Sequence, residues 1–172
     1  YMDNATAQNL IDLNTRFYAE HAASFSATRS APWEGWQHVA DLARERFGDA
    51  PTSLRVFDLA CGNLRFERFL AEQLPRTSLH VTAIDNCPAL AANMNELARV
   101  DYHSADILTA LLVQSDHSCV NANPTPQAAA LDAAFPHASC DIAVCFGFMH
   151  HVPGAALRQA ILSRLIGSVC PG

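Results

Sequence analysis

Residues 56–66 read VFDLACGNLRF, and this stretch decides which fold the sequence predicts. A β-prone apolar run ends beside the acid Asp58, a turn of small residues follows, and a helical pattern begins at Arg65. Small residues let a ligand approach the backbone, and the first turn of a helix leaves amide N–H groups free to bind it. The stretch therefore predicts a strand–turn–helix unit with a binding site at the end of its strand.

The rest of the chain repeats this alternation of strand and helix. Helices are expected over residues 5–25, 34–47, 65–74, 88–98 and 154–169, and strands over 54–59, 79–84, 100–104 and 141–146. Such an order predicts an α/β fold, a Rossmann-like, doubly wound parallel sheet. We expect an N-terminal helical cap over 1–50, an α/β core over 51–172 and an insertion within it at 114–136.

A second acid closes the next predicted strand. Asp85 follows Asp58 by 27 residues and stands shortly before Pro88. A carboxylate at this strand end can accept hydrogen bonds from both hydroxyls of a ribose, so the sequence predicts a ligand that contains adenosine. The alternative is that Asp85 only caps the helix expected to begin at Pro88.

These motifs carry a resemblance to a known family. DLACGNLRF resembles the first motif of class I S-adenosylmethionine-dependent methyltransferases, an acid followed by alternating glycines. Asp58 and Gly62 match that pattern, whereas Ala60 and Leu64 stand where glycines are usual. SADI at 104–107 and DIAVCFGFMHHV at 141–152 are similar to the family's third-strand and fourth-strand motifs. The resemblance implies S-adenosylmethionine as cofactor and S-adenosylhomocysteine as product.

The resemblance also implies which residues contact the cofactor. Asp106 would meet the adenine amino group and the amide of Ile107 the ring, although Asp106 also suits an ordinary loop. The predicted cofactor-binding residues are Tyr18, Phe25, Arg29, Asp58, Ala60, Cys61, Gly62, Asp85, Asn86, Asp106, Ile107, Cys145, Phe146 and Gly147.

The segment FSATRSAPW at 25–33 carries a narrower resemblance. It is similar to the segment before the core of methyltransferases that act on carboxymethylated wobble uridine of tRNA. There the first helix and turn fold over the cofactor, which implies that Tyr18 and Phe25 exclude water. Arg29 can pair bidentately with the carboxylate of a methionine moiety. The alternatives are packing for the aromatic residues and a surface ion pair for Arg29.

The implied reaction is an in-line displacement at a sulfonium methyl group, which needs orientation more than a protein nucleophile. His150 or His151 is the candidate general base if the acceptor must lose a proton. A structural role in the turn after the fourth strand is the alternative. We expect no metal, because adjacent histidines seldom face one ligand and no third ligand is near.

The composition of the chain limits the classes of partner and of site that can be expected. The net charge of −6 offers no overall basic surface for a polyanion, so a small-molecule acceptor is predicted, with tRNA as the narrower alternative. The six cysteines include no CxxC pair, which favours free thiols over zinc or disulfides. With no apolar run near 20 residues and no signal-peptide pattern, we expect a cytoplasmic protein.

The sequence also bears on two other functions and on the assembly of the chain. An NAD-linked oxidoreductase is disfavoured, because Arg65 stands where the GxGxxG motif has its third glycine. A non-catalytic module that binds S-adenosylmethionine or S-adenosylhomocysteine is the alternative suggested by Ala60 and Leu64. The family's sheet continues beyond a fourth strand, and this chain is expected to stop before the fifth. The open edge of 141–146 would then pair with a second copy in a homodimer.

Overall fold

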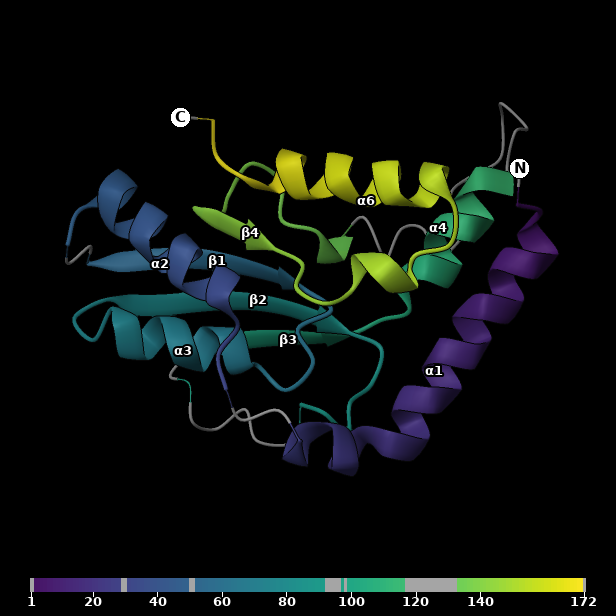
Figure 1. Cartoon of the computed structure of the whole chain (residues 1–172). Helices are drawn as coiled ribbons and strands as arrows, with labels where there is room; N and C mark the ends of the chain where they lie inside the picture. Colours follow the sequence, from purple (N-terminus) through teal and green to yellow (C-terminus); the bar gives the residue numbers. More distant parts are fainter. Residues whose placement is uncertain are drawn as a thin grey trace.

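The computed structural model describes residues 2–28, 31–49, 52–91, 97, 99–116 and 133–171. Within them lies one parallel sheet in the order β3-β2-β1-β4 (Figure 1). Its strands are β1 (Ser53–Leu59), β2 (Ser78–Asp85), β3 (Val100–Ser104) and β4 (Ile142–Val144). The predicted parallel α/β fold is confirmed.

The register brings the predicted acids to one end of the sheet. Asp58, near the end of β1, stands opposite Ala83 on β2 and Val144 on β4. The amides of Ala60 and Cys61 both donate to the carbonyl of Ile84, at 2.7 and 3.2 Å. The turn after β1 is therefore fixed against the end of β2.

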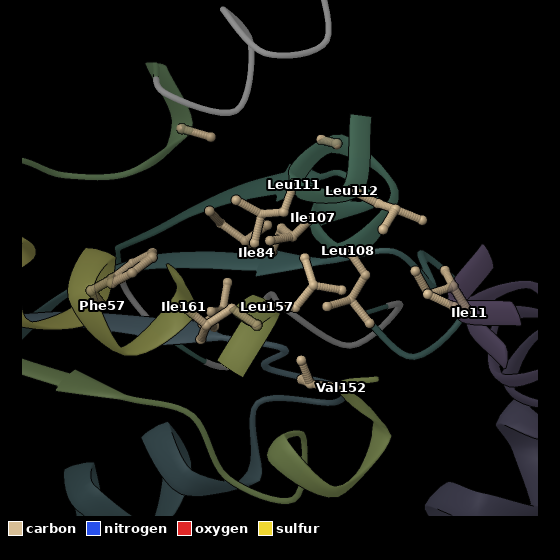
Figure 2. Packing of buried hydrophobic residues seen from close by; sticks show 14 of the residues in the cluster. Ile11, Phe57, Ile84, Ile107, Leu108, Leu111, Leu112, Val152, Leu157 and Ile161 are labelled. Carbon is tan, nitrogen blue, oxygen red and sulfur yellow. The ribbon is translucent and has the colours of Figure 1, made fainter. Parts of the chain in front are cut away.

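One face of the sheet is covered by α4 (Ile107–Asp116) and α6 (Ala155–Ser168). The helix α1 (Asn4–Ala27) packs against α4 beside this layer. Phe57 and Ile84 point from the strands into this layer, and Leu111 and Ile161 pack from α4 and α6 (Figure 2). α1 contributes Ala7 and Ile11 to the same core and runs past the carboxyl ends of the strands (Figure 1).

Two helices cover the opposite face. α2 (Glu34–Phe47) and α3 (Arg65–Gln73) pack with Leu54 and Val56 of β1. Alternate residues of a strand face opposite sides of the sheet, so Phe57 serves the first core and Val56 the second. Because α2 shares this core with β1, residues 34–47 pack directly on the sheet; the predicted cap at 1–50 stays a prediction.

The helix α4 was not expected from the sequence, and β4 is shorter than the strand expected at 141–146. Residues 146–148 form a turn instead, followed by the short 3-10 helix η2 (Met149–His151). Of the helix expected at 88–98, residues 88–91 form a turn. Leu97 lies in a bend, and the other residues of that helix and most of the expected insertion lie outside the described residues.

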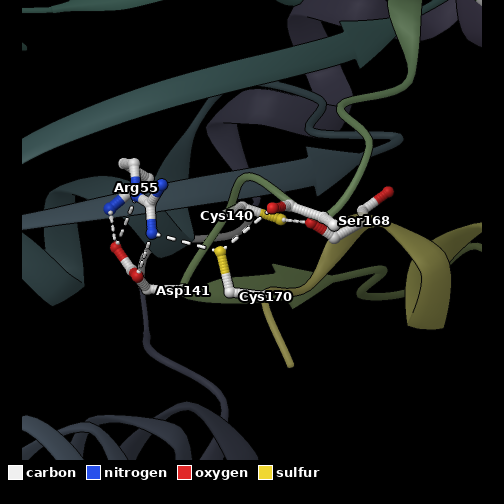
Figure 3. A network of polar contacts seen from close by, with 6 residues as sticks. Arg55, Cys140, Asp141, Ser168 and Cys170 are labelled. Carbon is white, nitrogen blue, oxygen red and sulfur yellow. Dashed lines mark hydrogen bonds and ion pairs between the residues drawn. The ribbon is translucent and has the colours of Figure 1, made fainter. Parts of the chain in front are cut away.

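An ion pair ties β4 to β1 (Figure 3). The Arg55 guanidinium donates to both carboxylate oxygens of Asp141, at 2.6 and 3.1 Å, and the Arg55 backbone N–H donates to one of them at 2.8 Å. On the other side of this segment Cys140 forms a parallel bridge with Val169. Residues 169–170 thus bond to the chain at the start of β4, the edge strand. The predicted pairing of this edge with a second copy stays a prediction.

Within the described ranges no helix has both the length and the hydropathy that a membrane crossing requires. The same ranges contain no group of three His, Cys, Asp or Glu side chains that could hold a metal ion. The cysteines that they include are free thiols: Cys61, Cys87, Cys140, Cys145 and Cys170.

Candidate functional site

A cavity of about 150 Å³ opens at the carboxyl ends of the strands, between the sheet and α1. That is many times the space one water needs, so the cavity is of ligand size. Most of the predicted site residues line it: Tyr18, Phe25, Asp58, Ala60, Cys61, Gly62, Asp85, Asn86, Asp106, Ile107, Phe146, Gly147, His150 and His151.

Two predicted residues are not part of this lining. Cys145 packs against the core on the α4–α6 side, because it points away from the cavity-lining Phe146 that follows it. Arg29 lies outside the residues that the structure describes. Its predicted role therefore stays a prediction.

The turn after β1 adopts left-handed backbone at three alternating positions. Ala60, Gly62 and Leu64 have φ values of 62°, 55° and 58°. Only glycine adopts this conformation without a steric cost. Ala60 and Leu64 adopt it all the same, and the Leu64 side chain is buried in the core beside α3.

Asp85 joins two turns of the site. Its carboxylate accepts the Gly62 N–H at 2.9 Å and the Cys87 N–H at 2.7 Å. Burial raises the pKa of Asp85, and these backbone hydrogen bonds act in the opposite direction. Each carboxylate oxygen has a further lone pair, so Asp85 can still accept from a ligand.

Asp58 is more deeply buried, and Glu67 of α3 is a second buried acid. Burial raises the pKa of both carboxyl groups, and the charge of Glu67 raises the pKa of Asp58 further. Asp58 Oδ1 and both Glu67 oxygens are buried and have no hydrogen-bond partner among the described residues. Glu67 was not expected near the site, because an acid in the first turn of a helix is ordinary.

Asp106 begins α4. Its carboxylate accepts the Thr109 backbone N–H at 3.0 Å and the Thr109 hydroxyl at 2.8 Å, as a helix-capping side chain does. Gln8 of α1 also donates to that hydroxyl, at 3.1 Å. Asp106 therefore has a structural role beside its predicted contact with adenine.

Aromatic side chains form one wall of the cavity. The Trp36 ring stacks on Trp33 at 5.8 Å and meets Phe146 edge-on at 5.9 Å, and the Arg65 guanidinium lies 5.1 Å from its centre. Gly147 closes the wall with a φ of 68°. A Cβ atom there would lie 2.7 Å from the outer edge of the Trp33 ring, so a larger residue at this position would require that ring to shift.

The opposite wall comes from α1 and η2. The Tyr18 hydroxyl and His151 Nε2 are hydrogen-bonded at 2.9 Å. The ring of His150 lies 3.8 Å from that of His151, but His150 is exposed whereas His151 is half-buried. Of the two histidines, His151 is the one held in place at the cavity.

Several lining residues were not singled out as ligand contacts from the sequence: Ile11, Asn14, Thr15, Trp33, Trp36, Asn63, Arg65, Phe66, Leu90, Ala105, Leu108 and Phe148. Ile11, Asn14 and Thr15 precede Tyr18 at helical spacing, which was the available signal. Thr15 accepts a hydrogen bond from Asn86 at 3.0 Å, which fixes α1 over the end of β2.

Several solved structures that resemble this chain in fold are methyltransferases. The amino pentose methyltransferase CalS10 of Micromonospora echinaspora is 19% identical, has a TM-score of 0.53, and aligns over 87% of this chain and 51% of its own. The 1,6-didemethyltoxoflavin-N1-methyltransferase of Burkholderia thailandensis is 16% identical, with a TM-score of 0.59, over 99% of this chain and 61% of its own. The sugar N-methyltransferase KedS8 of a Streptoalloteichus species is 17% identical, with a TM-score of 0.52, over 86% of this chain and 48% of its own.

At these identities the similarity shows the fold alone. The chain spans about half the length of CalS10 and of KedS8. No curated protein matches the sequence significantly. A family model described as a methyltransferase domain matches residues 57–166, which run from β1 into α6 and include the turns after β1 and β2. The chain belongs to this methyltransferase family.

Proposed function

We propose that this chain binds S-adenosylmethionine in the cavity and transfers its methyl group to a small-molecule acceptor. The observation that carries the proposal is the pair of acids at the strand ends, Asp85 and Asp58, which both line a cavity of ligand size. CalS10 was crystallised with S-adenosylmethionine, and the toxoflavin enzyme with S-adenosylhomocysteine and its heterocyclic substrate.

The residues present suit the chemistry of this cofactor. Asp85 can accept the ribose hydroxyls with the lone pairs that Gly62 and Cys87 leave free. The carboxyl group of Asp58, which lines the cavity, can accept from the ammonium group of the methionine moiety. Ile107 and Leu108, both buried at the cavity, supply an apolar surface for the adenine ring.

When bound, S-adenosylmethionine supplies a methyl group on a sulfonium that departs as a neutral thioether. The chain therefore contributes orientation and the exclusion of water. The aromatic wall around Trp36 shields one side of the cavity, and Tyr18 and Phe25 of α1 shield the other. His151 accepts the proton that an acceptor oxygen or nitrogen must lose, with its imidazole held by the Tyr18 hydroxyl.

A small-molecule acceptor is supported by the substrates of the structural neighbours, an amino pentose, a sugar and a toxoflavin precursor. The net charge of −6 agrees with this choice, because a polyanion such as tRNA calls for a basic surface. The segment that resembles the tRNA-modifying enzymes keeps tRNA as the narrower alternative.

Calorimetric titration with S-adenosylhomocysteine, 5′-methylthioadenosine and NAD tests the cofactor. We expect the first to bind most tightly and NAD not to bind; binding of NAD alone would overturn the proposal. Transfer of a radiolabelled methyl group to amino sugars, nitrogen heterocycles and unmodified tRNA then tests the acceptor. Binding without transfer to any of them would favour the non-catalytic module.

A further inference from the structure

The cavity continues past the residues that the proposed cofactor contacts use. Those contacts put the adenine ring after β3, the ribose at Asp85 after β2 and the ammonium group at Asp58 near the end of β1. In the sheet order β3-β2-β1-β4 the next strand is β4. Residues that follow β4 also line the cavity, so the part beside them is where an acceptor would lie next to the cofactor.

Aromatic rings line this part of the cavity. Phe146, which follows β4, meets the Trp33 ring edge-on, with ring centroids 6.2 Å apart and ring planes at 88°. Trp36 stacks on Trp33 and is itself 4% exposed, whereas Trp33 keeps 36% of its surface exposed while it lines the cavity. The buried Trp36 therefore supports Trp33, and Trp33 and Phe146 form an aromatic corner that a ligand can contact.

The polar groups here suit the edge of a ligand better than a ring of hydroxyl groups. Of the described residues that follow β4 and line the cavity, only His150 and His151 have polar side chains, and His151 is hydrogen-bonded to the Tyr18 hydroxyl. Arg65, on the aromatic wall, donates to the Ala31 carbonyl. A buried sugar needs a hydrogen-bond partner for each hydroxyl group, whereas a flat heteroaromatic ring buries its faces against other rings and needs partners only at its edge.

We propose that the acceptor is a flat heteroaromatic ring with a ring N–H, held between the aromatic corner and His151. The ring nitrogen forms a bond to the methyl carbon, the electron pair of the broken carbon–sulfur bond stays on sulfur, and the N–H proton passes to the His151 imidazole. Phe146 and Gly147, which the sequence predicted as cofactor contacts, face the acceptor in this arrangement. The inference rests on the proposed function.

Calorimetric titration of the chain saturated with S-adenosylhomocysteine tests the acceptor class without turnover. The probes are theophylline and lumazine, two flat heterocycles with a ring N–H, and glucosamine, an amino sugar. We expect both heterocycles to bind at least about tenfold more tightly than glucosamine, because only they can stack on the aromatic corner with both hydrogen-bonding edges exposed. A smaller difference, or no binding of either heterocycle, overturns this inference alone. Failure of S-adenosylhomocysteine itself to bind overturns the proposed function.

Variants of Trp33 test where the heterocycle binds. Trp33→Leu is expected to weaken theophylline by about tenfold, the usual effect of losing one stacking ring, and to leave the affinity for S-adenosylhomocysteine unchanged. Trp33→Phe keeps an aromatic ring and should lose less than about threefold. Phe17→Leu, at an exposed aromatic position on α1 outside the cavity lining, is the matched control and should keep the wild-type affinity.

Tryptophan emission gives a second readout of the same contact. Trp33 and Trp36 are the two tryptophans of the chain, and both line the cavity. Theophylline is expected to quench the emission of the wild-type chain and to quench Trp33→Leu less, because Trp36 alone remains there. Unchanged theophylline affinity in Trp33→Leu overturns the inference. An equal loss of affinity for S-adenosylhomocysteine does so too, because it would make Trp33 part of the cofactor site.

Discussion

The hydroxyl of Tyr18 and Nε2 of His151 lie 2.9 Å apart, which joins the first helix of the chain to the short helix after its fourth strand. The two residues are separated by 133 positions in the sequence. Their rings also meet edge-on, with centroids 5.5 Å apart. The contact closes one side of the cavity and fixes the imidazole that we assign to proton transfer.

Replacing His151 by asparagine is expected to lower kcat by about a hundredfold or more, the usual contribution of a positioned general base. Binding of S-adenosylhomocysteine should change little, because the proposed cofactor contacts lie on Asp58 and Asp85. Tyr18→Phe removes one hydrogen bond and should lower kcat by about tenfold or less. Steady-state kinetics with an acceptor and calorimetry measure the two effects. An equal loss of affinity and kcat would indicate that His151 has a structural role and is not the general base.

Asp85→Ala is expected to weaken S-adenosylhomocysteine by about 1–3 kcal/mol, the cost of losing charge-assisted hydrogen bonds. 5′-Methylthioadenosine should weaken by a similar amount, because it has the same ribose. The variant should also unfold at a lower temperature, since the Gly62 and Cys87 amides lose their acceptor. Asp49→Ala, at an exposed position, is the control. Unchanged affinity in a folded Asp85 variant would contradict the ribose assignment.

Glycine substitutions at the two left-handed residues Ala60 and Leu64 are expected to have opposite effects on the free energy of unfolding. Ala60→Gly should raise the free energy of unfolding by up to about 1 kcal/mol, because it relieves a left-handed cost of about 1–2 kcal/mol and adds a smaller entropy cost. Leu64→Gly relieves the same cost but removes a buried side chain worth about 2–5 kcal/mol, so it should destabilise. Urea unfolding followed by circular dichroism measures both. Destabilisation by both variants would show that the turn is not strained at Ala60.

The Arg55–Asp141 pair predicts a dependence of stability on pH. The hydrogen bond from Arg55 lowers the pKa of Asp141 below its usual value. Its contribution is therefore present above about pH 3.9 and is lost as the pH falls through the lowered pKa.

Asp141→Asn should lower the free energy of unfolding by about 1 kcal/mol at pH 7, since Arg55 is half exposed and solvent screens the pair. The difference from wild type should narrow as the pH falls below about 4. Asp41→Asn breaks an exposed pair with Arg44 on α2 and should cost less. A constant difference between pH 7 and pH 3 would mean that the charge on Asp141 is not responsible.

The strands and the turn after β1 were predictable because apolar β-prone runs stood between clear turn signals. The helix α4 was not predicted, since residues 107–112 are mostly apolar and show no polar face. Its start was nevertheless readable from Asp106 and Thr109, which make the capping contacts. β4 is shorter than expected because Asp141 bonds to Arg55 and the chain turns at Phe146.

Some residues of the candidate site were likewise predictable from the sequence, and others were not. Residues at strand ends, such as Asp85, follow from topology alone, because parallel strands end at one edge of the sheet. Asn14 and Thr15 reach the site by tertiary packing of α1, and their polar side chains looked like a solvated face. Glu67 escaped notice because only burial distinguishes it from a surface acid.

The close approach of Trp33 to Gly147 has a consequence for how this chain and its relatives vary. A side chain at position 147 would approach the indole ring to 2.7 Å, so it calls for a shift of that ring or a smaller residue at position 33. Sequences with alanine or serine at 147 are therefore expected to carry a smaller residue at 33. Such covariation would link a segment before the sheet to the turn after β4. It would indicate that homologues preserve the contact between these two parts of the cavity wall.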